Sequence, residues 1–197
     1  MVKKAKLAIL ISGRGSNMKS LVEACESGLV PASVGLILSN KQDAPGLEYA
    51  KNKGIKTAII NHKDFSNREE FDKGMNDILV EENIEIVCLA GFMRLLSGWF
   101  VGQWMDRLVN IHPSYLPEFK GADAVGDAIK AGVRQSGCSV HYVREEMDSG
   151  PIIKQVRVDV LDGDTKEDLA SRILESEHKI YPEALKIVCE DYMVSHK

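Results

Sequence analysis

The sequence predicts an α/β fold, with a Rossmann-like, mostly parallel central sheet and helices on both faces. Three observations support this prediction. Short apolar runs alternate with helical patterns, a glycine-rich turn joins the first run to the first helical pattern, and the run at residues 86–90 is apolar at every position. Strands of a parallel sheet that is covered on both faces read as continuous apolar runs, because neither side meets water.

Each element in the first half of the chain has a local reason. Strands are expected at residues 7–11, 34–38, 57–60 and 86–90. Helices are expected between them at residues 17–26, 45–53 and 67–82. Ser16 or Asn17 can cap the first helix, and Gly54 can end the second. Glu69 and Glu70 lie in the first turn of the third helix, where the helix dipole favours negative charge.

The second half of the chain follows a less regular order. Further strands are expected at residues 109–112, 139–143 and 152–158, and helices at residues 122–131 and 165–189. Gly132 can end the shorter helix. Pro182 lacks the amide hydrogen that a helix interior requires, so it is predicted to break the longer helix or to mark a junction in it. With 197 residues and no internal repeat, the chain is expected to form one domain.

Composition narrows the classes of function. The net charge of −4 argues against a broad nucleic-acid surface, which would be basic. No apolar run is long enough to cross a bilayer, and the glycine-rich turn interrupts the apolar start before it could serve as a signal peptide. The four cysteines have no paired spacing, which is typical of free thiols in a reducing compartment. We therefore expect a cytoplasmic protein without membrane or nucleic-acid partners.

The turn at residues 12–17 reads Ser-Gly-Arg-Gly-Ser-Asn and opens the first predicted helix. Glycines let backbone amides turn toward a ligand, and a helix N-terminus favours an anion such as phosphate. The turn differs from the dinucleotide fingerprint, because Met18 occupies the third glycine position and the second strand ends in Ser39 and Asn40 rather than in an acidic residue. The pattern fits a phosphate site and a tight turn without a ligand equally well.

The candidate catalytic group consists of Asn110, His112 and Asp148. Side chains alternate along a strand, so Asn110 and His112 point to the same side. Asp148 lies in an acidic turn that Gly150 and Pro151 restrict. Both segments are expected at the carboxyl ends of strands, where open α/β sheets bind ligands. A carboxylate beside histidine favours the charged imidazolium, which can donate a proton to a developing oxyanion. The group is therefore suited to polarising a carbonyl.

Two other interpretations of this group are weaker. His141 and His178 could join His112 at a metal ion, but their spacing does not resemble that of metal ligands. Ser114 lies close to His112, but the glycines of a nucleophile elbow do not surround it. We therefore expect neither a metal nor a covalent intermediate on serine.

Four segments of the chain resemble the phosphoribosylglycinamide formyltransferases, a family of folate-dependent formyltransferases. They are residues 11–17, 89–96, 110–117 and 147–153, which stand in the same order as in that family. The Asn-x-His-Pro-Ser element together with the distal Asp148 is specific to the superfamily of folate-dependent formyltransferases. The glycine-rich turn and the Glu-His-x-Ile-Tyr-Pro run at residues 177–182 narrow the resemblance to this family.

The resemblance implies 10-formyltetrahydrofolate as the formyl donor and the amine of glycinamide ribonucleotide as the acceptor, in purine biosynthesis. The ribonucleotide phosphate would be bound by Gly15, Ser16 and Asn17, and the amine end by Glu177. The folate would contact Arg68, Met93, Arg94, Leu95, Leu96, Asn110, Arg144, Glu145, Glu146, Met147 and Asp148. Residues 1–105 would form the phosphate-binding part, and residues 106–197 would carry the catalytic group and the folate loop. The enzyme would be a monomer or a homodimer.

Alternatives to this activity remain. Formyltetrahydrofolate hydrolase uses the same three residues with water as the acceptor, but it carries an added N-terminal domain that we do not expect here. Methionyl-tRNA formyltransferase carries an added C-terminal domain that binds RNA, which we also do not expect. A non-catalytic nucleotide-binding module would require the glycine-rich turn alone. The chain departs from common family members at Tyr115, where leucine is frequent, and at residues 121–125, which lack histidines that many members have.

Overall fold

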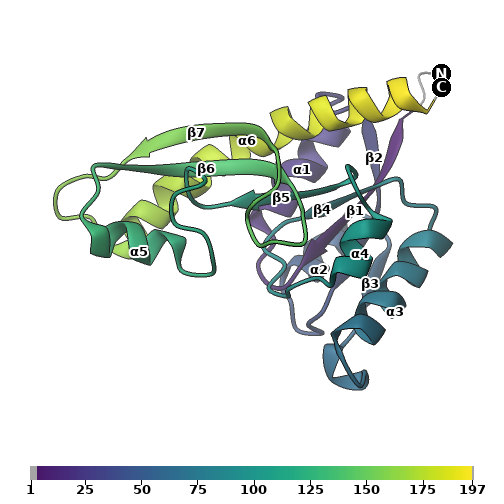
Figure 1. Ribbon diagram of the computed structural model, residues 1–197. Helices are drawn as coiled ribbons and strands as arrows, with labels where there is room; N and C mark the ends of the chain where they lie inside the picture. The colour runs from purple at the N-terminus through teal and green to yellow at the C-terminus, as the bar shows by residue number, and fades with distance from the viewer. Residues whose placement is uncertain (1–3, 197) are drawn as a thin grey trace.

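The computed structural model describes residues 4–196, which fold around one seven-stranded sheet in the order β3-β2-β1-β4-β5-β6-β7 (Figure 1). Five strands pair in parallel: β1 (Ala5–Ile11), β2 (Ala32–Ser39), β3 (Thr57–Ile59), β4 (Ile86–Leu89) and β5 (Leu108–His112). The last two, β6 (Gln135–Tyr142) and β7 (Ile152–Asp159), run antiparallel to their neighbours. The predicted mostly parallel sheet is confirmed.

Helices cover both faces of the sheet. The side chains of β1 point alternately to the two faces and are buried on each of them. Ile9 and Ile11 belong to one apolar cluster, whereas Ala8 and Leu10 belong to the other. Residues of α1 (Ser16–Glu26), α2 (Gly46–Asn52), α5 (Ala124–Ala131) and α6 (Lys166–Ser195) complete the first cluster. Residues of α3 (Arg68–Glu81) and α4 (Gly98–Gln103) complete the second. A strand that is buried on both sides has no polar face, which explains the continuous apolar run at residues 7–11 of β1.

The helix ends agree in part with the predicted capping residues. Gly54 follows the end of α2 with a φ of 68°, and Gly132 ends α5 in the left-handed conformation. A cap that was not predicted stands at the start of α3, where the Asn67 side chain accepts a hydrogen bond from the Glu70 amide at 3.0 Å. The prediction for α1 is wrong: the helix follows Gly15, whose φ is 70°, and neither Ser16 nor Asn17 caps it. Asn17 lies inside the helix rather than before it, and its Nδ2 donates a hydrogen bond to Glu177 on α6.

Two short elements were not predicted. They are α4 and a 3₁₀ turn at His62–Asp64, which are six and three residues long. A helix of six residues is too short to show a helical period in the sequence. The Ser97 side chain nevertheless accepts a hydrogen bond from the Phe100 amide at 3.3 Å and caps α4.

Helix α6 contradicts the predicted break at Pro182, because it continues from Lys166 to Ser195 with the proline inside. Proline has no amide hydrogen for the carbonyl four residues earlier, which belongs to His178. The Ser20 hydroxyl of α1 donates a hydrogen bond to this carbonyl at 2.7 Å. The helix continues because a neighbouring helix supplies the missing donor.

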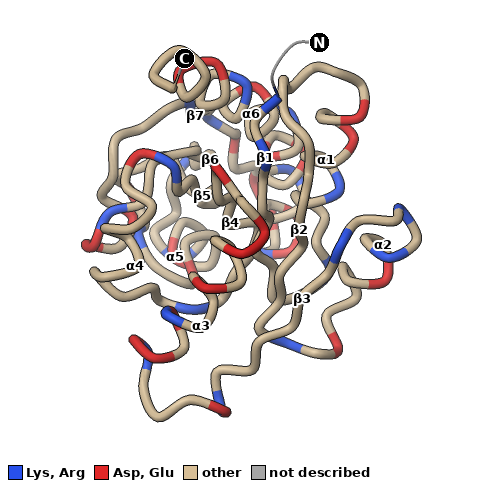
Figure 2. Tube along the Cα trace, turned by 90° about the vertical axis from the view of Figure 1, so that its right-hand side faces the viewer, with Lys and Arg blue, Asp and Glu red and all other residues tan. Residues whose placement is uncertain are grey.

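Strands β6 and β7 with α5, which we call the arm, project from the parallel part of the sheet (Figure 1). Basic and acidic residues are interspersed over the chain in the view of Figure 2. Among residues 4–196, no helix has the length and apolar character needed to span a membrane. Cys25, Cys88, Cys138 and Cys189 are buried free thiols.

We expect Ser20→Ala to lower the free energy of unfolding by about 1–2 kcal/mol, because the His178 carbonyl loses its donor. In a Pro182→Ala background the same change should cost less, since the backbone amide of an alanine at this position can donate the missing helical hydrogen bond. Denaturant unfolding of the four proteins of this double-mutant cycle measures the difference. An equal cost of Ser20→Ala in both backgrounds would contradict this explanation of the continuous helix.

Candidate active site

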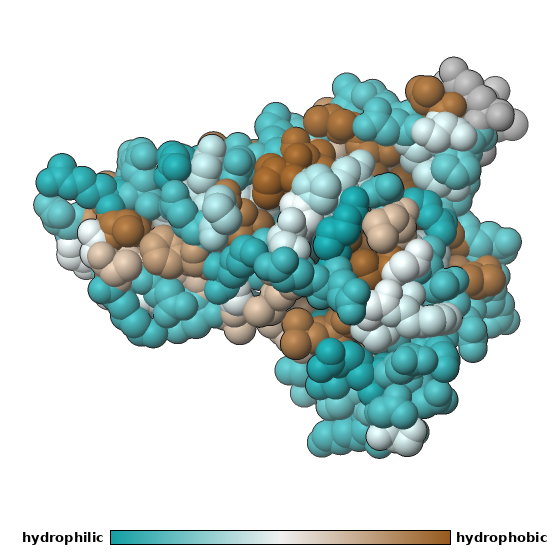
Figure 3. Space-filling model, viewed as in Figure 1, coloured by the Kyte–Doolittle hydropathy of each residue, from teal (hydrophilic) through white to brown (hydrophobic). Residues whose placement is uncertain are grey.

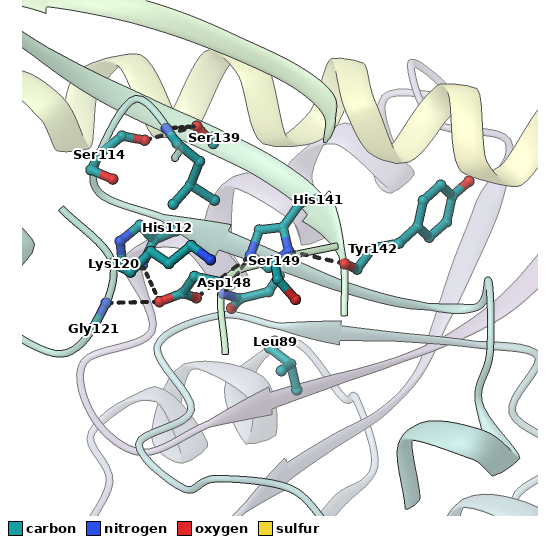
Figure 4. Close-up of polar contacts among 12 residues, drawn as sticks. Leu89, His112, Ser114, Lys120, Gly121, Ser139, His141, Tyr142, Asp148 and Ser149 are labelled. Carbon is teal, nitrogen blue, oxygen red and sulfur yellow. Dashed lines mark hydrogen bonds and ion pairs between the residues drawn. The ribbon is translucent and has the colours of Figure 1, made fainter. Parts of the chain in front are cut away.

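Strand β5 and the connection between β6 and β7 bring His112 and Asp148 together (Figure 4). The distance from His112 Nδ1 to Asp148 Oδ2 is 3.5 Å, and their side chains are only 7% and 9% exposed. On the other side of the ring, Nε2 lies 2.9 Å from the carbonyl oxygen of Phe119. A carbonyl can only accept, so Nε2 carries a proton. With an acceptor at each nitrogen, the site accommodates a doubly protonated, charged imidazole.

Backbone geometry fixes the position of Asp148. Its φ is 51°, in the left-handed region that aspartate tolerates better than most residues, and its Oδ2 accepts a hydrogen bond from the Gly121 amide at 2.9 Å. Two residues later, a Cβ on Gly150 would lie 1.6 Å from the Tyr142 carbonyl oxygen. The connection therefore requires glycine where it packs against the end of β6.

The connection reaches His112 by folding back. Strand β6 is antiparallel to β5, so its last residue, Tyr142, lies opposite Val109, whereas Ser139 lies opposite His112. The chain thus leaves β6 near the start of β5. It must then return toward the end of β5 to place Asp148 beside His112. The ends of β5 and β6 do not meet at one edge as the ends of two parallel strands would.

His141 also belongs to this group, although the sequence suggested it only as a possible metal ligand. It lies opposite Asn110 in the β5–β6 pairing, and Asn110 Nδ2 is 3.2 Å from His141 Nε2. Asp148 Oδ1 lies 3.8 Å from the same nitrogen of His141 (Figure 4). His141 Nδ1 donates to the Tyr142 carbonyl at 3.0 Å, so Nε2 is free to accept from the Asn110 amide. Burial lowers the pKa of His141, which favours this neutral form.

The glycine-rich turn and α6 form a second polar site. The Asn17 amide donates a hydrogen bond to Glu177 Oε2 at 2.7 Å, and both residues are buried. Burial raises the pKa of Glu177 to about 7. A cationic or amine ligand would stabilise the charged form of this carboxyl group, because burial has removed the water that would otherwise solvate the charge.

The conformation of Gly15 and a hydrogen bond of α6 shape this second site. A Cβ on Gly15 would lie 2.9 Å from the Met18 side chain, and the φ of 70° also favours glycine at this position. On α6, the Tyr181 hydroxyl donates to the Leu89 carbonyl at 2.9 Å. Because Glu177 precedes Tyr181 by about one helical turn, this bond holds Glu177 over the same end of β4.

The candidate folate residues are divided among four segments, which are α3, the residues after β4, β5 and the β6–β7 connection. Met93 and Leu95 follow β4 and are 72% and 55% exposed, and Met147 in the β6–β7 connection is 49% exposed. Figure 3 shows apolar surface in the notch where the arm meets the rest of the molecule. Leu96 and Arg94 are half-buried, and the charges of Arg68 and Arg94 both act on Asp72 of α3. Exposed apolar side chains are thus available for a flat ligand.

Three residues of the β6–β7 connection have other contacts. Arg144 pairs with Asp106 at 2.6 Å, and Glu146 pairs with Lys120 at 3.1 Å. The Glu145 carboxylate lies against Gly98 at the start of α4. Of the acidic residues predicted here, Asp148 contacts His112 directly. Within residues 4–196, no three His, Cys, Asp or Glu side chains form a group suited to a metal ion.

Comparison with known proteins identifies the family. Residues 5–185 match the family model described as formyl transferase. The chain belongs to the formyl transferase family. It is similar to the phosphoribosylglycinamide formyltransferase of Escherichia coli (strain K12), with 38% identity over 97% of this chain and 90% of that protein. It also resembles the structure of glycinamide ribonucleotide transformylase 1 from Symbiobacterium toebii, with a TM-score of 0.95, 40% identity, and coverage of 97% and 90% of the two chains.

The family also includes longer relatives. The trifunctional purine biosynthetic protein adenosine-3 of Homo sapiens is 48% identical over 94% of this chain, which spans 18% of that protein. The two departures from common family members lie beside the site, and the Gly121 amide in the second of them donates to Asp148. Arg157 stacks on the Tyr115 ring, 3.9 Å from its centre, and Asp123 pairs with Lys166 at 2.6 Å. Both contacts involve residues outside the group around His112.

The raised pKa of Glu177 predicts how stability depends on pH. The folded protein holds this proton up to pH about 7, whereas the unfolded chain releases it near pH 4.5, so the folded state loses stability as the pH rises between these values. Glu177→Gln cannot release a proton and should become more stable than the unaltered protein at pH 8, by an amount on the order of 3 kcal/mol. The two proteins should be equally stable at pH 4.5.

Denaturant unfolding from pH 4.5 to 8.5 measures this difference. Glu175→Gln is the matched control, since Glu175 lies on the same helix but is exposed. Its curve should parallel that of the unaltered protein. Parallel curves for Glu177→Gln as well would show that the buried carboxyl group does not titrate in this range.

Proposed function

We propose that the chain transfers the formyl group of 10-formyltetrahydrofolate to the amine of glycinamide ribonucleotide, in purine biosynthesis. The observation that carries the proposal is the convergence of Asn110, His112 and Asp148, with the second polar site supplied by α1 and α6. Relatives that match most of this chain and bear the name of this reaction support it. The site thus combines donors for a carbonyl oxygen with a carboxylate for an amine.

Binding of the ribonucleotide follows from the second site. The backbone amides of Gly15, Ser16 and Asn17 open α1, where unbonded amides and the helix dipole favour a phosphate. Glu177 then faces the amine end, and its carboxylate pairs with the protonated form or accepts from the neutral form. The attacking amine must be neutral, so Glu177 can also take up its surplus proton.

Binding of the folate follows from the exposed apolar segments. Met93, Leu95 and Met147 offer apolar contact to a flat ring system, while Arg68 and Arg94 offer positive charge to carboxylates at its other end. Leu96, Arg144, Glu145 and Glu146 belong to the same two connections and complete the proposed contacts. The amine would attack the formyl carbon of the bound folate, and the bond from that carbon to the folate nitrogen would then break. The surplus proton of the amine would be passed to that nitrogen, so that the folate leaves as tetrahydrofolate.

The catalytic group then stabilises charge that develops on the formyl oxygen. The Asn110 amide would donate to this oxygen, and the positive charge of protonated His112 would stabilise it, since both N–H groups of His112 face the Phe119 carbonyl and Asp148. Asp148 would keep His112 charged and oriented. Neutral His141 accepts one hydrogen of the Asn110 amide and so leaves the other for the formyl oxygen. Because these groups are held before the substrates bind, little reorganisation is required during the reaction.

The proposal also covers the organisation of the chain, its location in the cell and its assembly state. Residues 1–105 would carry the phosphate-binding part and residues 106–197 the catalytic group, with Asn17 and Glu177 joining the two parts. We propose a cytoplasmic enzyme of small-molecule substrates that acts without nucleic acid or membrane, as a monomer or a homodimer. Sedimentation analysis distinguishes the two assembly states.

Removing one donor from an oxyanion site typically lowers turnover by about 10²–10³-fold. We expect losses of this size in Asn110→Ala and in Asp148→Asn, with unchanged circular dichroism and melting temperature. Asp77→Asn, on the exposed side of α3, serves as the control and should retain full activity. Near-normal turnover in both site variants would contradict the proposed roles.

An assay of folate product with and without glycinamide ribonucleotide tests the reaction itself. We expect product only when the ribonucleotide is present. Product without it would indicate water as the acceptor, as in a formyltetrahydrofolate hydrolase, and would overturn the proposal. The absence of product in both cases would favour a nucleotide-binding module without catalysis.

A further inference from the structure

The segment that follows β4 has no secondary structure of its own. Within the described chain, residues 92–96 make no backbone–backbone hydrogen bond. The segment nevertheless presents Met93 and Leu95 at the surface and connects β4 to α4. Other parts of the molecule must therefore determine its conformation.

The first of these parts is Ser12, at the end of β1. Its hydroxyl accepts a hydrogen bond from the Met93 amide at 2.8 Å and donates one to Asn40 Oδ1 at 2.6 Å. Its own amide donates to the Gly91 carbonyl at 3.2 Å, so Ser12 bonds to the chain on both sides of Phe92. Ser12 is 6% exposed and is the first residue of the glycine-rich turn.

The second part is Asp72, on α3. Its side chain is fully buried, and Oδ2 accepts a hydrogen bond from the Ser97 amide at 2.6 Å. Ser97 also caps α4, so the same contact sets where this helix begins. The positive charges of Arg68 and Arg94 act on the carboxylate, which compensates part of the cost of burying it.

We propose that Ser12 and Asp72 are positioning residues for the folate, because they hold the two ends of residues 93–97 in the conformation that binds it. This inference rests on the proposed function. Between its two ends the segment has no backbone bonds, so loss of either contact would let it sample other conformations. Binding would then have to restore the order, which lowers affinity for the folate.

The same geometry predicts which substrate is affected. Met93, Arg94, Leu95 and Leu96 lie between the two contacts, whereas Gly15, Asn17 and Glu177 lie outside them. Loss of either contact should thus weaken binding of the folate far more than binding of the ribonucleotide. If the two residues only stabilised the fold, their loss would weaken the binding of both substrates to the same extent.

The test compares Ser12→Ala, Asp72→Ala and Asp72→Asn in full steady-state kinetics. We expect the KM for 10-formyltetrahydrofolate to rise about tenfold in both alanine variants, with the KM for the ribonucleotide and kcat within about twofold. Asp72→Asn keeps an oxygen that can accept from the Ser97 amide, so it should recover most of the folate affinity. Ser136→Ala is the control, since Ser136 is fully buried and its hydroxyl makes no hydrogen bond in the described chain.

Hydrogen exchange of the Met93 and Ser97 amides gives a readout that does not depend on activity. Both amides should exchange faster in the corresponding alanine variant, by a larger factor than the amides of the central strands, which report the stability of the whole fold. The inference is overturned by unchanged exchange, by an equal rise of both KM values, or by Asp72→Asn behaving as Asp72→Ala. If the unaltered protein transfers no formyl group, the proposed function fails, whereas exchange and the affinity for folic acid still test the two contacts.

Discussion

The change from parallel to antiparallel pairing at β5 is the constraint on which the candidate site depends. Strand β5 pairs in parallel with β4 and antiparallel with β6, so Asn110 lies opposite His141 and His112 opposite Ser139. This register places an imidazole beside the Asn110 amide. It also makes the β6–β7 connection fold back, which brings Asp148 to both histidines. A shift of the register by one residue would turn these side chains to opposite faces of the sheet.

The site uses burial to give similar groups different roles. His141 donates to a backbone carbonyl from one nitrogen and accepts the Asn110 amide at the other, which requires the neutral ring. His112 instead lies between a carbonyl and a carboxylate, which both accept. Glu177, in a third environment, has a pKa of about 7 because of its burial. Proton donors and acceptors are therefore distinguished by their surroundings rather than by residue type.

Long-range polar contacts hold the segments that carry these groups. Helix α6 continues past Pro182 because Ser20 bonds to the freed His178 carbonyl, and Tyr181 ties the same helix to the end of β4. The residues after β4 depend in turn on Ser12 and Asp72. Buried hydrogen bonds of this kind make irregular segments rigid without adding secondary structure.

The sequence by itself determined the sheet class, most of its strands and helices, and the pairing of Asn110 and His112 on one face, because these depend on local periodicity. The tertiary structure decided what distant segments contribute. It placed His141 in the site through strand register, and kept α6 continuous through a hydrogen bond from α1. Such contacts join residues far apart in the chain, and no local pattern records which donor meets which acceptor.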